Sequence, residues 1–153
     1  MPISVNGKGR VVIGDRVHFG YSKAPKFGDG GVLLQARDRN ARVTIGSRTI
    51  TSNNISIVAK ELIEIGEGCQ IGDQVTIYDS DFHEIAPEIR NESEGTPAPV
   101  VIGKNVWLGS RVMVLKGVTI GDHSVIAAGS VVAKSIPARC LAAGIPARVI
   151  RDI

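Results

Sequence analysis

Residues 102–137 read IGKNVW, LGSRVM, VLKGVT, IGDHSV, IAAGSV and VAKSIP, six consecutive units of six residues without an insertion. The first position of each unit is aliphatic, the second is usually Gly or Ala, and the fifth is small or β-branched. A helix repeats its apolar face about every 3.6 residues and a strand about every 2, so a period of six fits neither element alone. A short fixed period of this kind predicts a solenoid.

Each unit can supply one short extended segment and a corner, so three units make a triangular coil of about 18 residues. We expect the first and fifth positions to face the interior of this prism, and backbone amides to pair between coils. The first positions then stack in pairs one coil apart: Ile102 over Ile120, Leu108 over Ile126, and Val114 over Val132.

Three further motifs accompany the hexads: YDSDFH at residues 78–83, NVWLGS at residues 105–110 and AAGIPARVIRDI at residues 142–153. With them the sequence resembles the hexapeptide-repeat acyltransferases, especially the branch of maltose, galactoside and polysaccharide O-acetyltransferases. The resemblance covers nearly the whole chain. It implies an all-β fold, a left-handed parallel β-helix with one protruding loop and a short C-terminal tail. The left-handed sense comes from the resemblance alone, because most parallel crossovers are right-handed.

No shift of composition marks a second domain, so residues 1–153 are interpreted as a single β-helix acyltransferase domain. The hexad register weakens in residues 1–20 and is lost at about residues 21–41, where prolines and glycines predict an irregular excursion. Within this excursion, residues 32–35 are a candidate strand. The register returns at Ile45.

Two interruptions follow. Between Ala59 and Leu62 the register shifts by two residues, which is cheap at a corner and costly inside a strand. Residues 79–99 are polar and contain prolines, so they predict an extended loop that leaves the prism. After the last hexad, residues 138–153 are expected to form an irregular C-terminal cap.

Composition excludes several classes of protein. The chain has no 18-residue apolar run and no signal-like start, which predicts a soluble cytoplasmic protein without a membrane span. The net charge is only +3, and the sequence has no basic arm with interleaved aromatic residues, so no nucleic-acid partner is expected. Two cysteines are too few for a disulfide framework, and Cys69 occupies an inward fifth position, so we interpret it as a small buried hydrophobe.

The loop sequence DSDFHEI (residues 79–85) carries the candidate catalytic group. An imidazole can remove a hydroxyl proton near neutral pH, so His83 is the candidate general base. Asp79, Asp81 and Glu84 are candidate carboxylates that would orient it. The alternative is a solvated loop histidine. The resemblance favours catalysis, because the family's essential histidine falls in this loop.

The resemblance also implies binding residues for a substrate and a coenzyme. Asn54 matches the position whose amide meets the acceptor sugar, although the adjacent Asn53 and a structural Asn ladder remain alternatives. Trp107 either packs between subunits or lines the site. Ser110 matches the residue near the thioester of acetyl-CoA. The other matches to coenzyme-binding positions are Ala128, Ala133, Lys134, Arg148 and Arg151.

The sequence therefore predicts an acetyl-CoA-dependent O-acetyltransferase that modifies a hydroxyl of a sugar or of a surface-polysaccharide precursor, working as a homotrimer with sites between subunits. An amine acceptor or a scaffold without catalysis are the alternatives. A metal site like that of the γ-type carbonic anhydrases needs three histidines together, and His18 and His123 lie in unrelated repeat positions, so no metal is expected.

Overall fold

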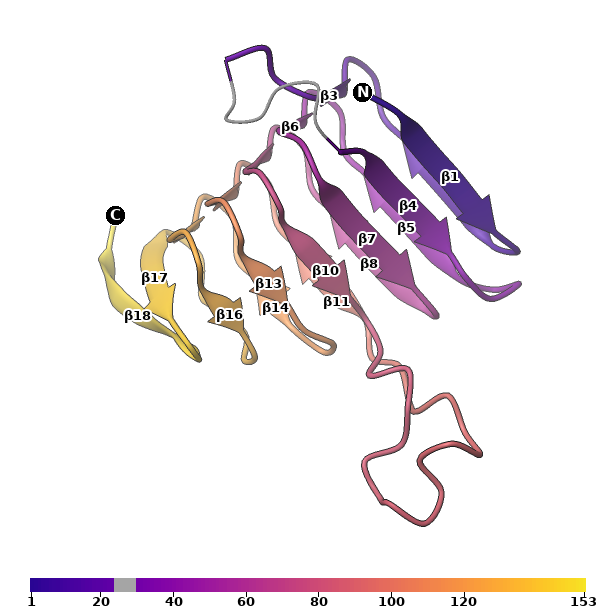
Figure 1. The fold of residues 1–153 in the computed structure, drawn as a ribbon. Coiled ribbons are helices and arrows are strands. Elements are labelled where there is room, and N and C mark those ends of the chain that lie inside the picture. The colour runs from indigo at the N-terminus through magenta and orange to yellow at the C-terminus, as the bar shows by residue number, and fades with distance from the viewer. Residues whose placement is uncertain (24–29) are drawn as a thin grey trace.

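A computed structural model of the chain describes residues 1–23 and 30–153. In this part of the chain every regular element is a β-strand, and the strands stack into three sheets that form the sides of a triangular prism (Figure 1). All strand pairs are parallel except the last one, between β17 and β18. The solenoid predicted from the period of six is confirmed as a parallel β-helix.

Each of the first five coils contributes one strand to each sheet, and the last coil meets the second sheet only through a single bridge between Ile136 and Ile120. The first sheet has the order β1 (Ile3–Gly7), β4 (Val32–Ala36), β7 (Ile55–Ala59), β10 (Thr76–Tyr78), β13 (Met113–Val114) and β16 (Val131–Val132). The second has β2 (Arg10–Ile13), β5 (Arg42–Ile45), β8 (Leu62–Ile65), β11 (Val100–Ile102) and β14 (Thr119–Ile120). The third has β3 (His18–Phe19), β6 (Ile50–Thr51), β9 (Gln70–Ile71), β12 (Trp107–Leu108), β15 (Val125–Ile126), β17 (Cys140–Gly144) and β18 (Ala147–Asp152).

The core of the prism is a column of stacked aliphatic side chains. The three predicted stacking pairs are register partners in neighbouring coils: Ile102 with Ile120, Leu108 with Ile126, and Val114 with Val132. The first and fifth positions of all six hexads are buried. Each apolar side chain removed from water contributes about 1.5–3 kcal/mol, so the column supplies the main driving force for folding.

The second hexad position is small because neighbouring coils approach closely there. A Cβ added at Gly109 would lie 2.6 Å from the backbone nitrogen of Ala128 in the next coil. In the first five hexads the fourth position has a left-handed backbone, with φ angles of 52° at Asn105, 60° at Arg111 and 64° at His123. These two constraints give the hexad its strict length.

The predicted excursion is shorter than about residues 21–41. Residues 32–36 form β4, a regular strand that pairs with both β1 and β7. The part of the excursion at residues 24–29, which includes Pro25 and Gly28, lies outside the described residues. The candidate strand at residues 32–35 is therefore confirmed, although it falls outside the hexad register because the corner after it, residues 37–41, is longer than a hexad allows. The two-residue shift near residue 60 lies at the corner between β7 and β8, as predicted.

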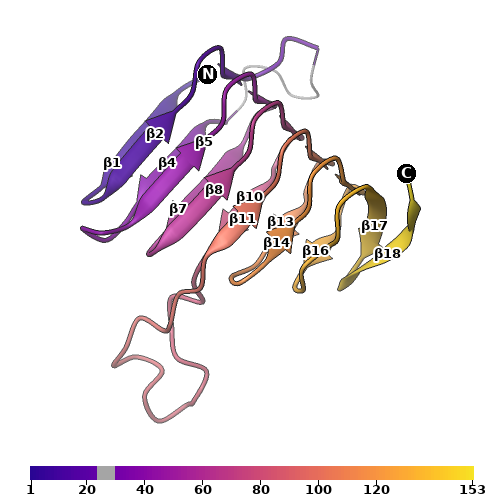
Figure 2. The same cartoon turned by 180° about the vertical axis from the view of Figure 1, so that it is seen from behind.

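Residues 79–99 leave the prism between β10 and β11 and form the one large excursion in the described chain (Figures 1 and 2). This loop is confirmed. The prediction of an irregular C-terminal cap is wrong in its local structure, because β17 and β18 form an antiparallel hairpin along the end of the third sheet. Pro146 excludes a helix there, but it sits in the turn of the hairpin and leaves the strands on both sides intact.

Candidate active site

The ring of His83 is held by the backbone of its own loop. His83 is exposed, and its Nδ1 lies 3.2 Å from the carbonyl oxygen of Arg90. A carbonyl oxygen only accepts, so this contact places the hydrogen on Nδ1 and leaves the lone pair of Nε2 free. The structure therefore gives His83 the tautomer that a general base needs.

The three carboxylates predicted to orient His83 have other partners in the structure. Asp79 is fully buried and accepts hydrogen bonds from three backbone amides at the corner between β7 and β8: Lys60, Glu61 and Leu62, at 2.8, 2.7 and 2.8 Å. Asp81 forms an ion pair with Lys116, and Glu84 accepts a hydrogen bond from Ser93. These partners come from other coils or from the loop itself, and among the described contacts none joins the three carboxylates to the His83 ring, so the orienting role stays a prediction.

The segment before His83 is fixed by an aromatic anchor. Phe82 has a left-handed backbone with φ of 60°, a conformation that costs an L-residue about 1–2 kcal/mol. Its ring packs edge-on against Tyr78, with centroids 5.4 Å apart, and the guanidinium carbon of Arg37 lies 4.4 Å from its centre. These contacts hold the strained residue in place, so they determine where the next side chain, His83, begins.

The returning arm of the loop packs against the same histidine. Gly95 has φ of 70°, and a Cβ added to it would lie 2.7 Å from the carbonyl oxygen of His83. Next to it, the Glu94 carboxylate is 2.7 Å from the ammonium of Lys60, whose side chain is only 8% exposed. The hydrogen bond and charge of Lys60 hold the pKa of Glu94 below its ordinary value. Both arms of the loop are thus tied to the corner at residues 60–61.

The third sheet carries two adjoining hollows. One, of about 330 Å³, is lined by residues that include Tyr21, Gln70 and Trp107. The other, of about 540 Å³, is lined by residues that include Trp107, Ser110 and Ala128. Trp107 is 54% exposed and belongs to both. The structure therefore brings together three of the residues predicted for the acceptor and the coenzyme.

Asn54 lies at the corner between the third and first sheets, one residue before β7. Its backbone has φ of 56°, and its side-chain nitrogen donates to the carboxylate of Asp73 at 3.3 Å. Asn53 is fully buried, so of the two asparagines Asn54 is the one that can reach a ligand. The binding role of Asn54 stays a prediction.

The predicted coenzyme cations gather at the C-terminal end of the prism. Lys134 and Arg148 line one hollow of about 220 Å³. Ala133, next to Lys134, is exposed at the corner after β16. Arg151 lies in β18 and is the register partner of Leu141, which also lines the larger hollow at Trp107. A ligand extending from Ser110 toward this end would pass from an apolar hollow to basic side chains.

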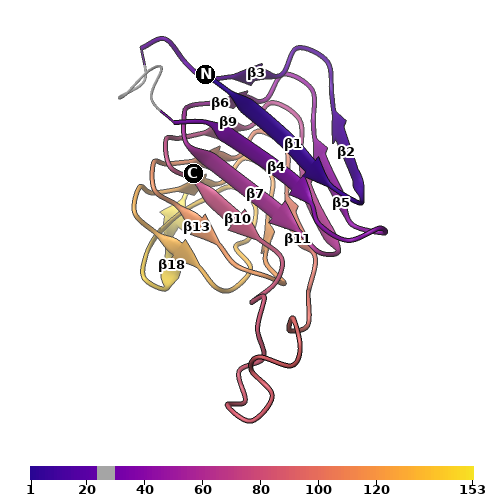
Figure 3. The same ribbon diagram turned by 45° about the vertical axis from the view of Figure 1, so that its right-hand side comes forward.

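Within one chain, His83 and the hollows at Trp107 lie on different parts of the prism. The loop leaves the prism where the first and second sheets meet, whereas the hollows lie along the third sheet. In Figure 3, β6 and β9 of the third sheet lie away from the loop. No residue of the loop is among the residues that line either hollow. The candidate base and the candidate coenzyme hollow of the same chain therefore do not meet.

Among residues 1–23 and 30–153 no group of His, Cys, Asp and Glu is arranged to hold a metal ion. His123 is at a corner and accepts on Nδ1 from the side-chain amide of Asn105, 3.1 Å away, while His18 is on β3. In the same described residues, no helix is long and apolar enough to cross a membrane.

Comparison with known proteins shows which family has this repeat and fold. Residues 99–134 match the model of the bacterial transferase hexapeptide with six repeats. The chain is 42% identical over 113 residues to galactoside O-acetyltransferase of Escherichia coli K12, a match that covers 74% of this chain and 55% of the relative. The chain belongs to the hexapeptide-repeat acyltransferase family.

Two solved structures of this family have the same fold. A galactoside acetyltransferase in complex with coenzyme A is 36% identical, with a TM-score of 0.71, and the match covers 94% of this chain and 64% of that one. A hexapeptide-repeat acetyltransferase of Vibrio cholerae O1 biovar eltor, solved with acetyl coenzyme A, is 28% identical with a TM-score of 0.69, covering 97% and 70%. The hexapeptide-repeat protein described here is a left-handed parallel β-helix, as the resemblance implies. It spans just over half the length of the curated relatives it matches.

Sequence reasoning missed the residues that hold the loop. The Arg90 carbonyl is a backbone group and leaves no mark on side-chain patterns. Lys60 had a usable signal, because the two-residue shift between Ala59 and Leu62 marks a corner of unusual length whose amides need a cap. Arg37 had none, since it falls in the stretch where the register is lost.

Proposed function

We propose that this hexapeptide-repeat protein is an acetyl-CoA-dependent O-acetyltransferase that acts on a sugar hydroxyl, with His83 as general base. The observation that carries the proposal is the Nδ1–H of His83 donating to the Arg90 carbonyl, since it leaves Nε2 basic on an exposed loop. The relatives support the class of reaction, because the E. coli relative is a galactoside O-acetyltransferase and solved relatives bind coenzyme A or acetyl coenzyme A.

The reaction needs positioning, a base and a donor for the developing oxyanion, and no covalent enzyme intermediate. His83 Nε2 takes the proton of the acceptor hydroxyl, and the oxygen attacks the thioester carbonyl carbon. The new C–O bond forms, the carbonyl oxygen becomes an oxyanion, and Ser110 or a backbone amide beside it stabilises this charge. The C–S bond then breaks, and the thiolate of coenzyme A takes the proton from the imidazolium.

The coenzyme would lie along the third sheet. Its pantetheine arm fits the apolar hollow at Trp107, Ser110 and Ala128, and its phosphates meet Lys134 and Arg148 at the C-terminal end. Arg151 and Ala133 lie on the same end. Asn54 would meet the acceptor. The reaction takes place in the cytoplasm, where acetyl-CoA is available.

The protein would work as a homotrimer with sites between subunits. His83 extends from the corner between the first and second sheets and the hollow at Trp107 lies on the third sheet, so a complete site needs the loop of one chain beside the third sheet of a neighbour. The exposed indole of Trp107 would then be covered by that neighbour. Symmetric closure of such a contact gives three equal sites.

A thiol-release assay tests the base. Wild type and His83→Ala are compared with acetyl-CoA and a panel of sugars, and the variant should lose about 10²–10⁴-fold in kcat with KM for acetyl-CoA unchanged. Ser93→Ala, on the same loop and exposed, is the matched control and should stay close to wild type. Equal rates for wild type and His83→Ala on an authentic acceptor would remove the assignment and favour a scaffold without turnover.

A further inference from the structure

A row of cations runs along the corner between the first and second sheets, on the coils that precede the loop. Lys8, Arg37 and Lys60 occupy this corner in three successive coils, and the loop 79–99 follows in the fourth. The amide of Lys8 donates to the carbonyl of Arg37, and the amide of Arg37 donates to that of Ala59, so the residues are direct neighbours. Two coil spacings separate the first cation of the row from the last, so the row is about 10 Å long.

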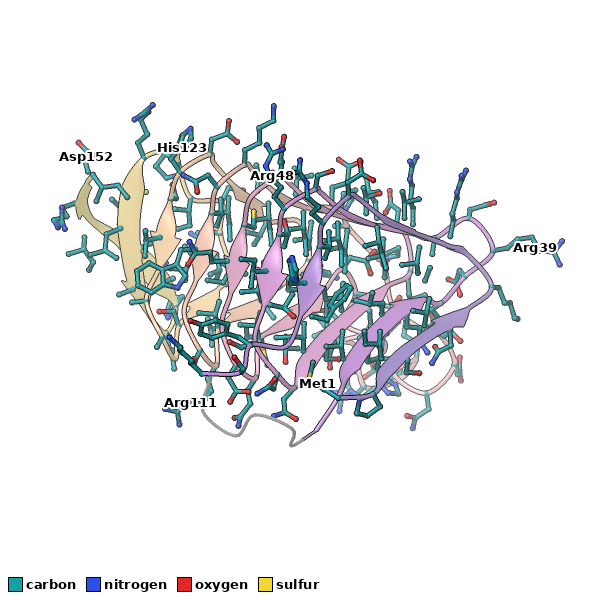
Figure 4. All side chains as sticks on the ribbon, turned by 90° about the horizontal axis from the view of Figure 1, so that it is seen from above. Met1, Arg39, Arg48, Arg111, His123 and Asp152 are labelled. Atoms are coloured by element: carbon teal, nitrogen blue, oxygen red, sulfur yellow. The ribbon has the colours of Figure 1, made fainter. Side chains whose placement is uncertain are left out.

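Two further arginines extend the row onto the second sheet. Arg10 on β2 and Arg42 on β5 are register partners, both exposed. Like charges placed directly opposite in a sheet repel each other. Among the described residues, neither guanidinium forms an ion pair. Arg39 projects from the same corner into solvent (Figure 4). An arrangement of this kind is stabilised by an anion from outside the chain.

The corner is more basic than the protein as a whole. Residues 7–10 and 37–42 contain five cations, Lys8, Arg10, Arg37, Arg39 and Arg42, and one carboxylate, Asp38, which gives a net charge of +4 against +3 for the entire chain. Asp38 lies 3.9 Å from the ammonium of Lys60, which also pairs with Glu94. Both carboxylates are therefore shared with Lys60, and the charge of Glu94 also acts on Arg37 and Lys8.

Arg37 connects this surface to the candidate active site. Its Nε donates to the side chain of Gln35 at 3.0 Å, and its guanidinium lies over Phe82, the residue before His83. A guanidinium over an aromatic ring loses part of its freedom to rotate, while its terminal N–H groups can still bind a carboxylate or phosphate. Among the described groups, no oxygen accepts from these terminal nitrogens.

We propose that this basic corner, formed by Lys8, Arg10, Arg37, Arg39 and Arg42, binds the anionic part of the acceptor and presents the neighbouring hydroxyl to His83. The inference rests on the proposed function and narrows its substrate to an anionic saccharide. The anion is the carboxylate of an acidic polysaccharide or the phosphate of a sugar nucleotide, which share the same recognition chemistry.

Equilibrium binding tests the corner without turnover. Polygalacturonate and UDP-N-acetylglucosamine are the carboxylate and phosphate probes, dextran is the neutral one, and a short duplex DNA tests unspecific polyanion binding. The variant Arg39→Glu/Arg42→Glu is compared with Lys104→Glu/Arg139→Glu, which makes the same charge change at exposed sites of another corner. Wild type should bind at least one anionic saccharide, and the first variant should lose about tenfold or more in affinity while the control stays within about twofold.

Tighter binding of polygalacturonate than of UDP-N-acetylglucosamine, or the reverse, shows whether the anion of the acceptor is a carboxylate or a phosphate. The proposal would be overturned if dextran bound as tightly as the anionic saccharides, or if DNA did so. It would also be overturned if both double variants lost the same affinity for the anionic saccharides. A change of oligomeric state in Arg39→Glu/Arg42→Glu would also overturn it, because the corner would then be a subunit contact. If wild type transferred acetyl to none of the acceptors, the proposed function would be overturned instead. The two failures are distinguishable because saccharide binding is measured without acetyl-CoA.

Discussion

Removal of the Asp79 carboxylate should destabilise the protein far more than its position at the base of a loop implies. Asp79 is fully buried, and its two oxygens accept three backbone N–H groups of the preceding corner at 2.7–2.8 Å. Hydrogen bonds to a charged group contribute about 1.5–3 kcal/mol each. The three are not additive, because the corner can relax and water can reach the exposed Glu61, so Asp79→Ala should cost about 3–5 kcal/mol.

Asp79→Asn keeps one oxygen and turns an NH₂ group toward an amide donor, so it should cost about 1–3 kcal/mol. Chemical and thermal unfolding measure both variants, and a loss of 1 kcal/mol lowers Tm by about 2–4 °C in a domain of this size. Asp81→Asn is the matched control, since its carboxylate is 42% exposed and forms one ion pair with Lys116, which is worth about 1 kcal/mol or less. Equal unfolding midpoints for Asp79→Ala and Asp81→Asn would refute the capping role.

Three further predictions concern the loop and the core. Because the pKa of Glu94 is lowered, its contact with Lys60 is present above the ordinary carboxyl range and is lost as the pH falls through the lowered value, so protease cleavage of the wild-type loop should accelerate only at strongly acid pH. Glu94→Gln should be cleaved quickly at neutral pH, because it lacks the charge that pairs with Lys60. Cleavage of Glu94→Gln no faster than that of wild type would contradict the role of this ion pair. Gly95→Ala should lower kcat about tenfold or more, measured by thiol release, because its Cβ would displace the His83 backbone; an unchanged rate would show that the loop is loose. Burial raises the pKa of the Cys69 thiol, so native protein should not react with a thiol reagent at neutral pH and urea-unfolded protein should react fully; fast labelling of the native state would place Cys69 outside the core.

The period of six predicts the prism because every hexad position has one structural task. The first and fifth positions fill the interior, the second allows close approach of coils, and the fourth makes the left-handed turn. Strand pairing then follows from spacing alone. The hairpin of β17 and β18 lies beyond the hexads, and β4 precedes a corner of a different length, so periodicity describes neither of them.

The candidate site is predicted less completely, because it depends on contacts between coils. The loop and an exposed His83 follow from the sequence, and Trp107, Ser110 and Ala128 meet in one hollow as the resemblance implies. The partner of His83 does not follow, since a backbone carbonyl has no residue signature. The capping contacts of Asp79 do not follow either, because closeness in sequence to His83 says nothing about the amides of the preceding coil. The binding roles themselves, and the extent of the domain, stay predictions.

The central claim is that a complete site needs two chains, and mixed assemblies test it most directly. His83→Ala removes the base, and Ala128→Arg fills the coenzyme hollow from an exposed position. Neither variant alone should release thiol. After the two are unfolded together and refolded, or coexpressed, about one quarter of the sites should combine an intact His83 with an intact hollow, and activity should return to about that fraction of wild type. No activity in any mixture, with mixed assemblies confirmed by mass, would contradict the shared site.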